Sequence, residues 1–190
     1  DWGEFYLPQS SMRLKGSLSN GYRLLKLSEA LILADDANIT ASAEADFTQT
    51  PWTADISFAT DPLDLAAWSK NYPRLSPYKL TGKTSLDARL LRQEGKWSLP
   101  KLDLSLQDVS GEFYYFPVEG ASGEFSAAQN FTDLYARLTS GKVTVDRSVF
   151  DKLDFSGTYR KGNLYANIAS GELNGIPLKM NLSVNKVTSS

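Results

Sequence analysis

Apolar and polar residues alternate along most of the chain. From Ile39 to Phe47, every odd position is apolar and every even position is polar. A period of two is that of a β-strand with one buried face. The same alternation recurs down the chain and predicts about eleven or twelve strands, several of them longer than usual.

Turn-forming residues separate the expected strands. Hairpin signals stand at Ser19-Asn20-Gly21, Asp35-Asp36, Gln93-Glu94-Gly95, Lys161-Gly162-Asn163 and Asn174-Gly175. Five Ser-Gly pairs, at residues 110–111, 122–123, 140–141, 156–157 and 170–171, are each followed by a polar and then an apolar residue. We expect these pairs to mark hairpins too. Strands that are neighbours in sequence should therefore pair, which favours one extended antiparallel sheet.

One segment departs from the strand pattern. Asp61 is a suitable N-cap and Pro62 a suitable first helical residue, so we expect a short helix over residues 62–70. Pro73 and Pro77 follow it and end it. The helix divides the chain into an N-terminal β segment (1–60), a helical and proline-rich connection (61–77) and a C-terminal β meander (78–190), together one elongated body.

The composition removes most familiar catalytic chemistry. The chain has no cysteine and no histidine, which are common nucleophiles, general bases and metal ligands. Its 20 basic and 22 acidic residues are interspersed and give a net charge of −2, so no basic surface is expected to attract nucleic acid. We expect no enzyme activity, no catalytic residue, no metal and no cofactor.

The order of elements resembles that of a known family. A short helix after Asp61-Pro62 and a proline-rich exit are followed by strands reading Lys79-Leu80-Thr81-Gly82-Lys83 and, over residues 99–111, LPKLDLSLQDVSG. This order, over most of residues 60–186, resembles the AsmA-like family, the AsmA- and TamB-type bacterial envelope proteins. The resemblance implies a long, highly curved antiparallel sheet, forming an open groove or trough with an apolar inner face.

The resemblance also implies a location and a role. It implies the periplasm of a Gram-negative bacterium, as part of a protein anchored in the inner membrane outside this segment. The chain begins at Asp1 and not at Met, and we expect it to be a piece of a longer polypeptide. The implied role is phospholipid transport between the inner and outer membranes, or outer-membrane biogenesis. The expected partners are phospholipid or another acyl-chain ligand and other envelope proteins.

The apolar positions of the alternating segments are the candidates to line such a groove. They are Ile39, Phe47, Ile56, Phe58, Leu86, Leu90, Leu102, Leu104, Leu106, Leu134, Leu138, Val143, Val145, Phe155, Ile168, Leu178, Met180 and Leu182. Arginines on the rim could meet a lipid headgroup, and the candidates are Arg89, Arg92, Arg137, Arg147 and Arg160.

Other interpretations remain open. The alternating strands could form the dry core of a closed β-sandwich that recognises a glycan or a protein through surface aromatics. The run Tyr114-Tyr115-Phe116 must place rings on both faces of a strand and is a candidate platform. A glycosidase built on two carboxylates is a third reading, and Glu112 and Glu124 occupy equivalent places after Ser-Gly pairs.

Overall fold

The computed structural model describes residues 10–34, 37–113 and 116–185 of the chain. Its elements are β1 (Ser10–Ser19), β2 (Leu24–Ala34), β3 (Ala37–Asp46), β4 (Thr53–Thr60), β5 (Leu63–Asp64), α1 (Leu65–Asn71), the 3-10 turn η1 (Ser76–Tyr78), β6 (Thr81–Gln93), β7 (Lys96–Phe113), β8 (Phe116–Ala128), β9 (Asp133–Val145), β10 (Ser148–Arg160), β11 (Asn163–Leu173), β12 (Ile176–Pro177) and β13 (Met180–Val184).

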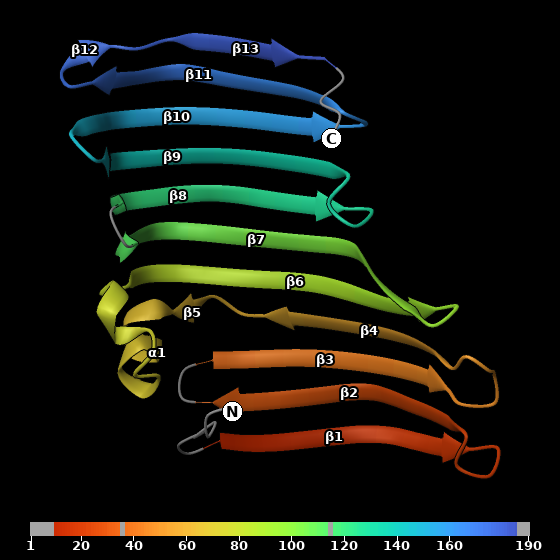
Figure 1. The fold of residues 1–190 in the computed structure, drawn as a ribbon. Coiled ribbons are helices and arrows are strands. Elements are labelled where there is room, and N and C mark those ends of the chain that lie inside the picture. The colour runs from red at the N-terminus through yellow and green to blue at the C-terminus, as the bar shows by residue number, and fades with distance from the viewer. Residues whose placement is uncertain (1–9, 35–36, 114–115, 186–190) are drawn as a thin grey trace.

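All the strands of the described residues belong to one 13-stranded antiparallel sheet (Figure 1). The spatial order follows the chain from β1 to β12, except that the short β5 pairs with one end of β6 and β13 pairs with β11 beside β12. Because β4 pairs directly with β6, the sheet continues without a break across the helical connection. The expected fold class, a long open antiparallel sheet with one short helix, is confirmed.

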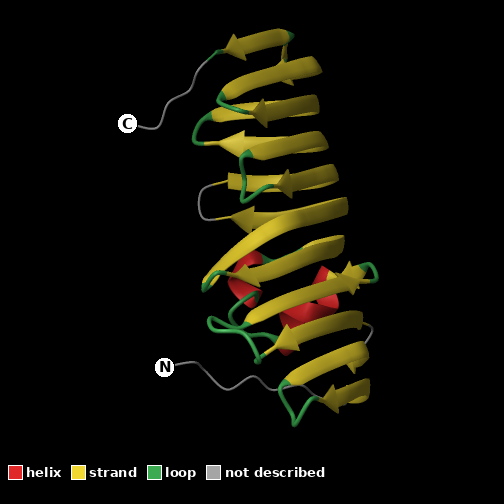
Figure 2. Cartoon of the chain, turned by 90° about the vertical axis from the view of Figure 1, so that its right-hand side faces the viewer, coloured by secondary structure: helices red, strands yellow, loops and turns green. Residues whose placement is uncertain are grey.

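The sheet is a single twisted layer (Figure 2). The chain exposes 13072 Å² of accessible surface, whereas a compact monomer of this mass would expose roughly 9,000 Å². Among the described residues, no large side chain is fully buried. The closed sandwich considered from the sequence is therefore wrong, because no second layer covers the described sheet.

The short helix forms slightly later in the chain than the sequence indicated. Its N-cap is Asp64, whose Oδ1 accepts hydrogen bonds from the backbone amides of Ala66 and Ala67 at 2.9 and 3.0 Å. Leu63 and Asp64 pair with β6, so Asp61 does not cap the helix. No helix among the described residues is long and apolar enough to cross a membrane.

The two-residue hairpin signals are confirmed where the structure describes them. Glu94-Gly95, Lys161-Gly162 and Asn174-Gly175 connect adjacent strands, and both residues of each pair have positive φ, as tight hairpins of this type require. Asn20 and Gly21, which begin the turn between β1 and β2, also have positive φ. The expected turn at Asp35-Asp36 and the aromatic residues Tyr114 and Tyr115 lie outside the described residues.

The Ser-Gly pairs, in contrast, are not turns. Each lies inside one of the strands β7 to β11, so the expectation of hairpins there is wrong. At two of them a side chain would instead be too close to a neighbour. A Cβ on Gly123 would lie 2.0 Å from the carbonyl oxygen of Arg137 on β9, and a Cβ on Gly111 would lie 2.8 Å from the Leu80 side chain.

Irregularities in these strands keep the apolar residues on one side. The register shifts between Leu106 and Val109 on β7, and Asp108 between them has positive φ. Gly120 on β8 and Lys152 on β10 also have positive φ. Each irregularity inserts an extra residue into its strand. Apolar residues therefore move from even to odd positions, or the reverse, and still point to the same side of the sheet.

Candidate functional site: the apolar face

One row of paired residues crosses the whole sheet and is apolar throughout except for the hydroxyl of a tyrosine. It runs, in register, through Leu14, Ala30, Ala41, Phe58, Ala88, Leu102, Ala127, Leu134, Tyr159, Leu164 and Val184. Directly paired residues point to the same side of a sheet. From β1 to β13 the row extends roughly 48 Å, at ~4.8 Å per strand spacing. We call the side that carries this row the apolar face.

The sequence-derived groove candidates that lie in paired strands share this face. They are Ile39, Ile56, Phe58, Leu86, Leu90, Leu102, Leu104, Leu106, Leu134, Leu138, Val143, Val145, Phe155, Ile168, Met180 and Leu182. Phe47 directly follows β3, and its ring lies 5.4 Å from that of Trp52. Leu178 precedes β13 and donates its amide hydrogen bond to the carbonyl of Gly171.

Several small side chains on the apolar face are buried, whereas larger ones are partly exposed to solvent. Ala88 and Ala127 are 2% and 3% exposed, because larger neighbours on adjacent strands cover them. The larger side chains, such as Leu102 and Leu104, remain only partly buried. Towards the two edges the exposure rises, reaching 64% at Met12 and 43% at Leu182. The apolar face thus has a shielded floor and solvent-accessible side chains above it.

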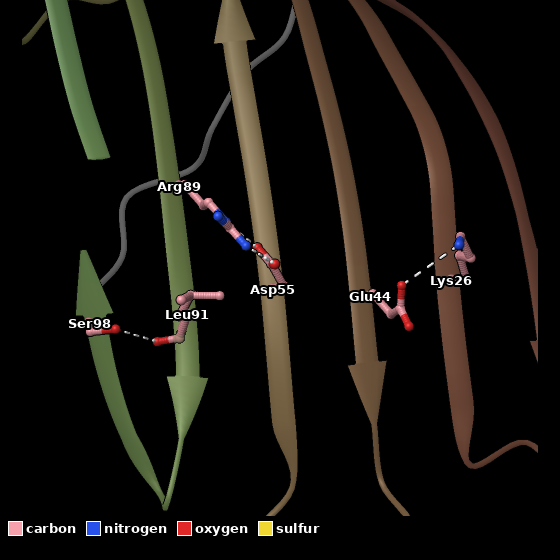
Figure 3. A network of polar contacts seen from close by, with 6 residues as sticks. All are labelled: Lys26, Glu44, Asp55, Arg89, Leu91 and Ser98. Atoms are coloured by element: carbon pink, nitrogen blue, oxygen red, sulfur yellow. Dashed lines mark hydrogen bonds and ion pairs between the residues drawn. The ribbon is translucent and has the colours of Figure 1, made fainter. Parts of the chain in front are cut away.

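The opposite side, which we call the polar face, carries charged and hydroxyl side chains (Figure 3). Arg89 holds Asp55 in a two-pronged ion pair with contacts of 2.9 and 2.5 Å, and its hydrogen bond lowers the pKa of Asp55. Lys26 lies 3.8 Å from Glu44 on the neighbouring strand. These pairs are solvent-exposed, so they contribute little stability and chiefly mark the water-facing side.

A hollow of about 320 Å³ lies on the polar face across β9 to β13. Tyr135, Thr158 and Tyr165 occupy one row of its lining, so the tyrosines flank the threonine. The rest of the lining comprises Ser156, Gly157, Ala166, Asn167, Asn181, Leu182 and Ser183, and none of these residues is charged. The hollow combines exposed phenol rings with neutral hydrogen-bonding groups.

The five candidate arginines separate between the two faces. Arg89 and Arg137 lie on the polar face, Arg160 pairs with Asp133, and Arg147 is exposed in the turn after β9. Arg92 alone of the five lies on the apolar face. It pairs in register with Ala54 on one side and with Trp97 on the other.

Arg92 is held by aromatic rings. Its guanidinium carbon lies 4.1 Å from the ring centroid of Trp52 and 5.8 Å from that of Trp97. The two indoles meet edge to face, with centroids 6.1 Å apart, and Phe47 extends the group. Nothing near residues 52, 92 or 97 in the sequence reveals this cluster, because the three residues meet only through the pairing of β4 with β6 and of β6 with β7.

The two glutamates of the glycosidase reading are not brought together. Glu124 pairs in register with Ser105 on β7, seven positions before Glu112 on the same strand. At about 3.3 Å per residue, roughly 20 Å separate the two positions, whereas paired glycosidase carboxylates lie within about 10 Å. Glu112 instead forms an ion pair with Lys79 at 2.7 Å.

Comparison with family models, with curated proteins and with solved structures found no match to this chain. The resemblance to the AsmA-like family therefore stays a prediction from the sequence.

Proposed function

We propose that this chain provides an apolar surface for the acyl chains of phospholipids, in transport between the inner and outer membranes or in outer-membrane biogenesis. The observation that carries the proposal is the apolar face, which crosses the sheet from β1 to β13 and has no second layer of described residues over it. Exposed apolar surface of this extent marks a site of interaction. In this proposal the chain acts in the periplasm as part of a membrane-anchored protein and catalyses no reaction.

The binding energy that an open face can supply favours movement of an acyl chain along the face over tight binding at one place. Each methylene fully removed from water contributes about 0.8 kcal/mol, and a face that covers one side of a chain supplies about half of that. An acyl chain of about 14 methylenes would gain about 5–6 kcal/mol. Association costs at least about 4 kcal/mol, so a chain held at any one position binds weakly. Weak, repeated binding lets a chain move along the face.

The replacement Leu104→Asp tests the proposal. Leu104 lies on the apolar face beside Leu86 and Phe125, and Ser105 next to it lies on the polar face. Because the face is open, the new carboxylate can reach water and the protein should stay folded. We expect the affinity for a spin-labelled fatty acid to fall about tenfold in Leu104→Asp and to stay unchanged in the matched control Ser105→Asp.

Two results would contradict the proposal. Equal binding by the two variants would show that acyl chains do not use the apolar face. Unfolding by Leu104→Asp alone, seen by circular dichroism, would indicate a sealed core in which a buried charge has no partner.

The hollow between Tyr135 and Tyr165 supports a second candidate function, recognition of a neutral glycan on the polar face. Aromatic rings stack on sugars, and amide and hydroxyl groups bond their hydroxyls. Tyr165 is 50% exposed and Asn167 and Asn181 lie beside it in the lining. This function would be lost in Tyr165→Ala and would survive Leu104→Asp, whereas acyl-chain binding would respond in the opposite way.

A further inference from the structure

We propose that Arg92, which contacts Trp52 and Trp97, binds the anionic headgroup of an acyl-chain ligand at one end of the apolar face. This inference rests on the proposed function and names the chemistry that the ligand carries at its polar end. It assigns a phosphate, presented by an amphiphile whose chain lies on the adjoining apolar side chains.

The first observation is the place of Arg92. Its row on the apolar face reads Leu25, Ala45, Ala54, Arg92 and Trp97, and the next row inward continues with Ile56 and Leu90. Arg92 therefore lies where the apolar surface ends, beside the hairpin that joins β6 and β7. Ala45 and Ala54 are 8% and 7% exposed and carry no side chain long enough to cover the guanidinium.

The second observation is the state of the guanidinium. The Nε of Arg92 is buried and has no hydrogen-bond partner among the described residues. No ion pair between described residues includes Arg92, whereas Arg89 on the polar face pairs with Asp55. A buried donor without an acceptor is costly, so a small movement of the side chain that brings Nε to an anionic oxygen, the strongest acceptor, is favourable.

The third observation is preorganisation. The indoles of Trp52 and Trp97 approach the guanidinium through cation–π contacts. Contact of the indoles with the side chain buries Nε, whereas the terminal Nη groups are not among the buried unpartnered atoms and can meet the oxygens of a phosphate. Since the aromatic contacts already restrict the side chain, less rotamer entropy is lost when the anion binds.

A phosphate headgroup on an acyl chain should bind this site more tightly than a free phosphate ion. A phosphate alone gains only the contact with Arg92, which water and salt weaken at an accessible site. Octyl phosphate adds methylenes that can lie over Ile56 and Leu90. We therefore expect octyl phosphate to bind at least about tenfold more tightly than inorganic phosphate.

The test compares octyl phosphate, 1-octanol and inorganic phosphate as probes on the whole chain and on Arg92→Gln. Binding is followed by the NMR signals of the indole N–H groups of Trp52 and Trp97, and circular dichroism checks the fold. Arg137→Gln, on the polar face, is the matched control. We expect Arg92→Gln to weaken octyl phosphate about tenfold, to leave 1-octanol unchanged, and Arg137→Gln to change neither.

The possible results distinguish failure of the headgroup site from failure of the proposed function. If 1-octanol binds but octyl phosphate binds no more tightly, or if Arg92→Gln weakens both equally, the headgroup site is overturned and the apolar face stands. If inorganic phosphate alone binds as tightly as octyl phosphate, the site is an anion site unrelated to acyl chains. If neither octyl probe binds, both proposals fail. Arg92→Lys keeps the charge but loses the planar fork, so it should bind octyl phosphate more tightly than Arg92→Gln and less tightly than the parent. This second variant keeps the test valid if Arg92→Gln does not fold.

Discussion

Gly123 is the position where the strand pairing can be tested most severely. It lies inside β8, in register with Leu138 on β9, and a Cβ there would meet the carbonyl oxygen of Arg137 at 2.0 Å and the Cα of Leu138 at 2.9 Å. Both contacts are with backbone, which cannot rotate away. Replacing Gly123 by alanine must therefore push two central strands apart by more than about 1 Å, given normal contact distances of about 3.5 Å.

The loss of stability in Gly123→Ala has two sources, weakened hydrogen bonds and steric strain. Separating β8 from β9 weakens one or two ladder hydrogen bonds, each contributing about 1 kcal/mol, and adds the strain of overpacking, about 1–3 kcal/mol. We expect Gly123→Ala to lower the free energy of unfolding by about 2–4 kcal/mol. Because small domains are stable by only about 5–15 kcal/mol, this loss is large.

Gly141 provides the matched control. It follows Ser140 on β9, and a Cβ there would meet the carbonyl oxygen of Glu119 at 3.2 Å, a tight contact that a small shift relieves. Gly141→Ala should stay within about 1 kcal/mol of the parent, since alanine also reduces the entropy of the unfolded chain. Urea denaturation followed by tryptophan fluorescence measures both. Equal stability of the two variants would refute the pairing of Gly123 with Leu138.

Two further predictions concern the helix cap and the polar face. Asp64→Ala should destabilise the chain by about 1 kcal/mol in urea denaturation, because two helix amides lose their acceptor, whereas Asp61→Ala should leave the helix intact; the reverse order would restore Asp61 as the cap. Arg89→Gln should raise the pKa of Asp55 towards its usual value, measured by NMR titration, because the hydrogen bond from Arg89 lowers it. Since the folded pKa of Asp55 is depressed, the stability from this pair is present above the unfolded pKa, about 3.9, and is lost as the pH falls through the folded pKa. An unchanged pKa in the variant would show that the ion pair does not persist in solution.

The sheet could be predicted because its signal is local. Alternation over Ile39 to Phe47 and the turn pairs Glu94-Gly95 and Lys161-Gly162 each specify a strand or a hairpin without reference to the rest of the chain. Meander pairing then follows from the short connections. Whether the apolar side chains meet a second layer is not a local property, so the residue pattern alone also allowed a closed sandwich, and only the family resemblance favoured the open sheet that the structure shows.

The errors arise from contacts between distant residues. Ser-Gly is a turn signal in isolation, but at Gly123 the glycine is needed because β9 approaches closely, which residues near 123 do not reveal. Asp61 and Asp64 both precede the helix, and the pairing of Asp64 with Lys83 on β6 selects the second as the cap. Arg92 was one of five equivalent rim candidates until the pairing of β4, β6 and β7 placed it among the tryptophans.

The most direct measurement is photo-crosslinking from Leu104, with Ser105 as the outward control, in the chain expressed in the envelope of a Gram-negative cell. The two positions are adjacent on β7 and face opposite sides of the sheet. Mass spectrometry of the purified protein would identify any adduct. Phospholipid attached at position 104 and not at position 105 is the result expected if acyl chains lie on the apolar face. No lipid at position 104, or equal amounts at both positions, would contradict that claim.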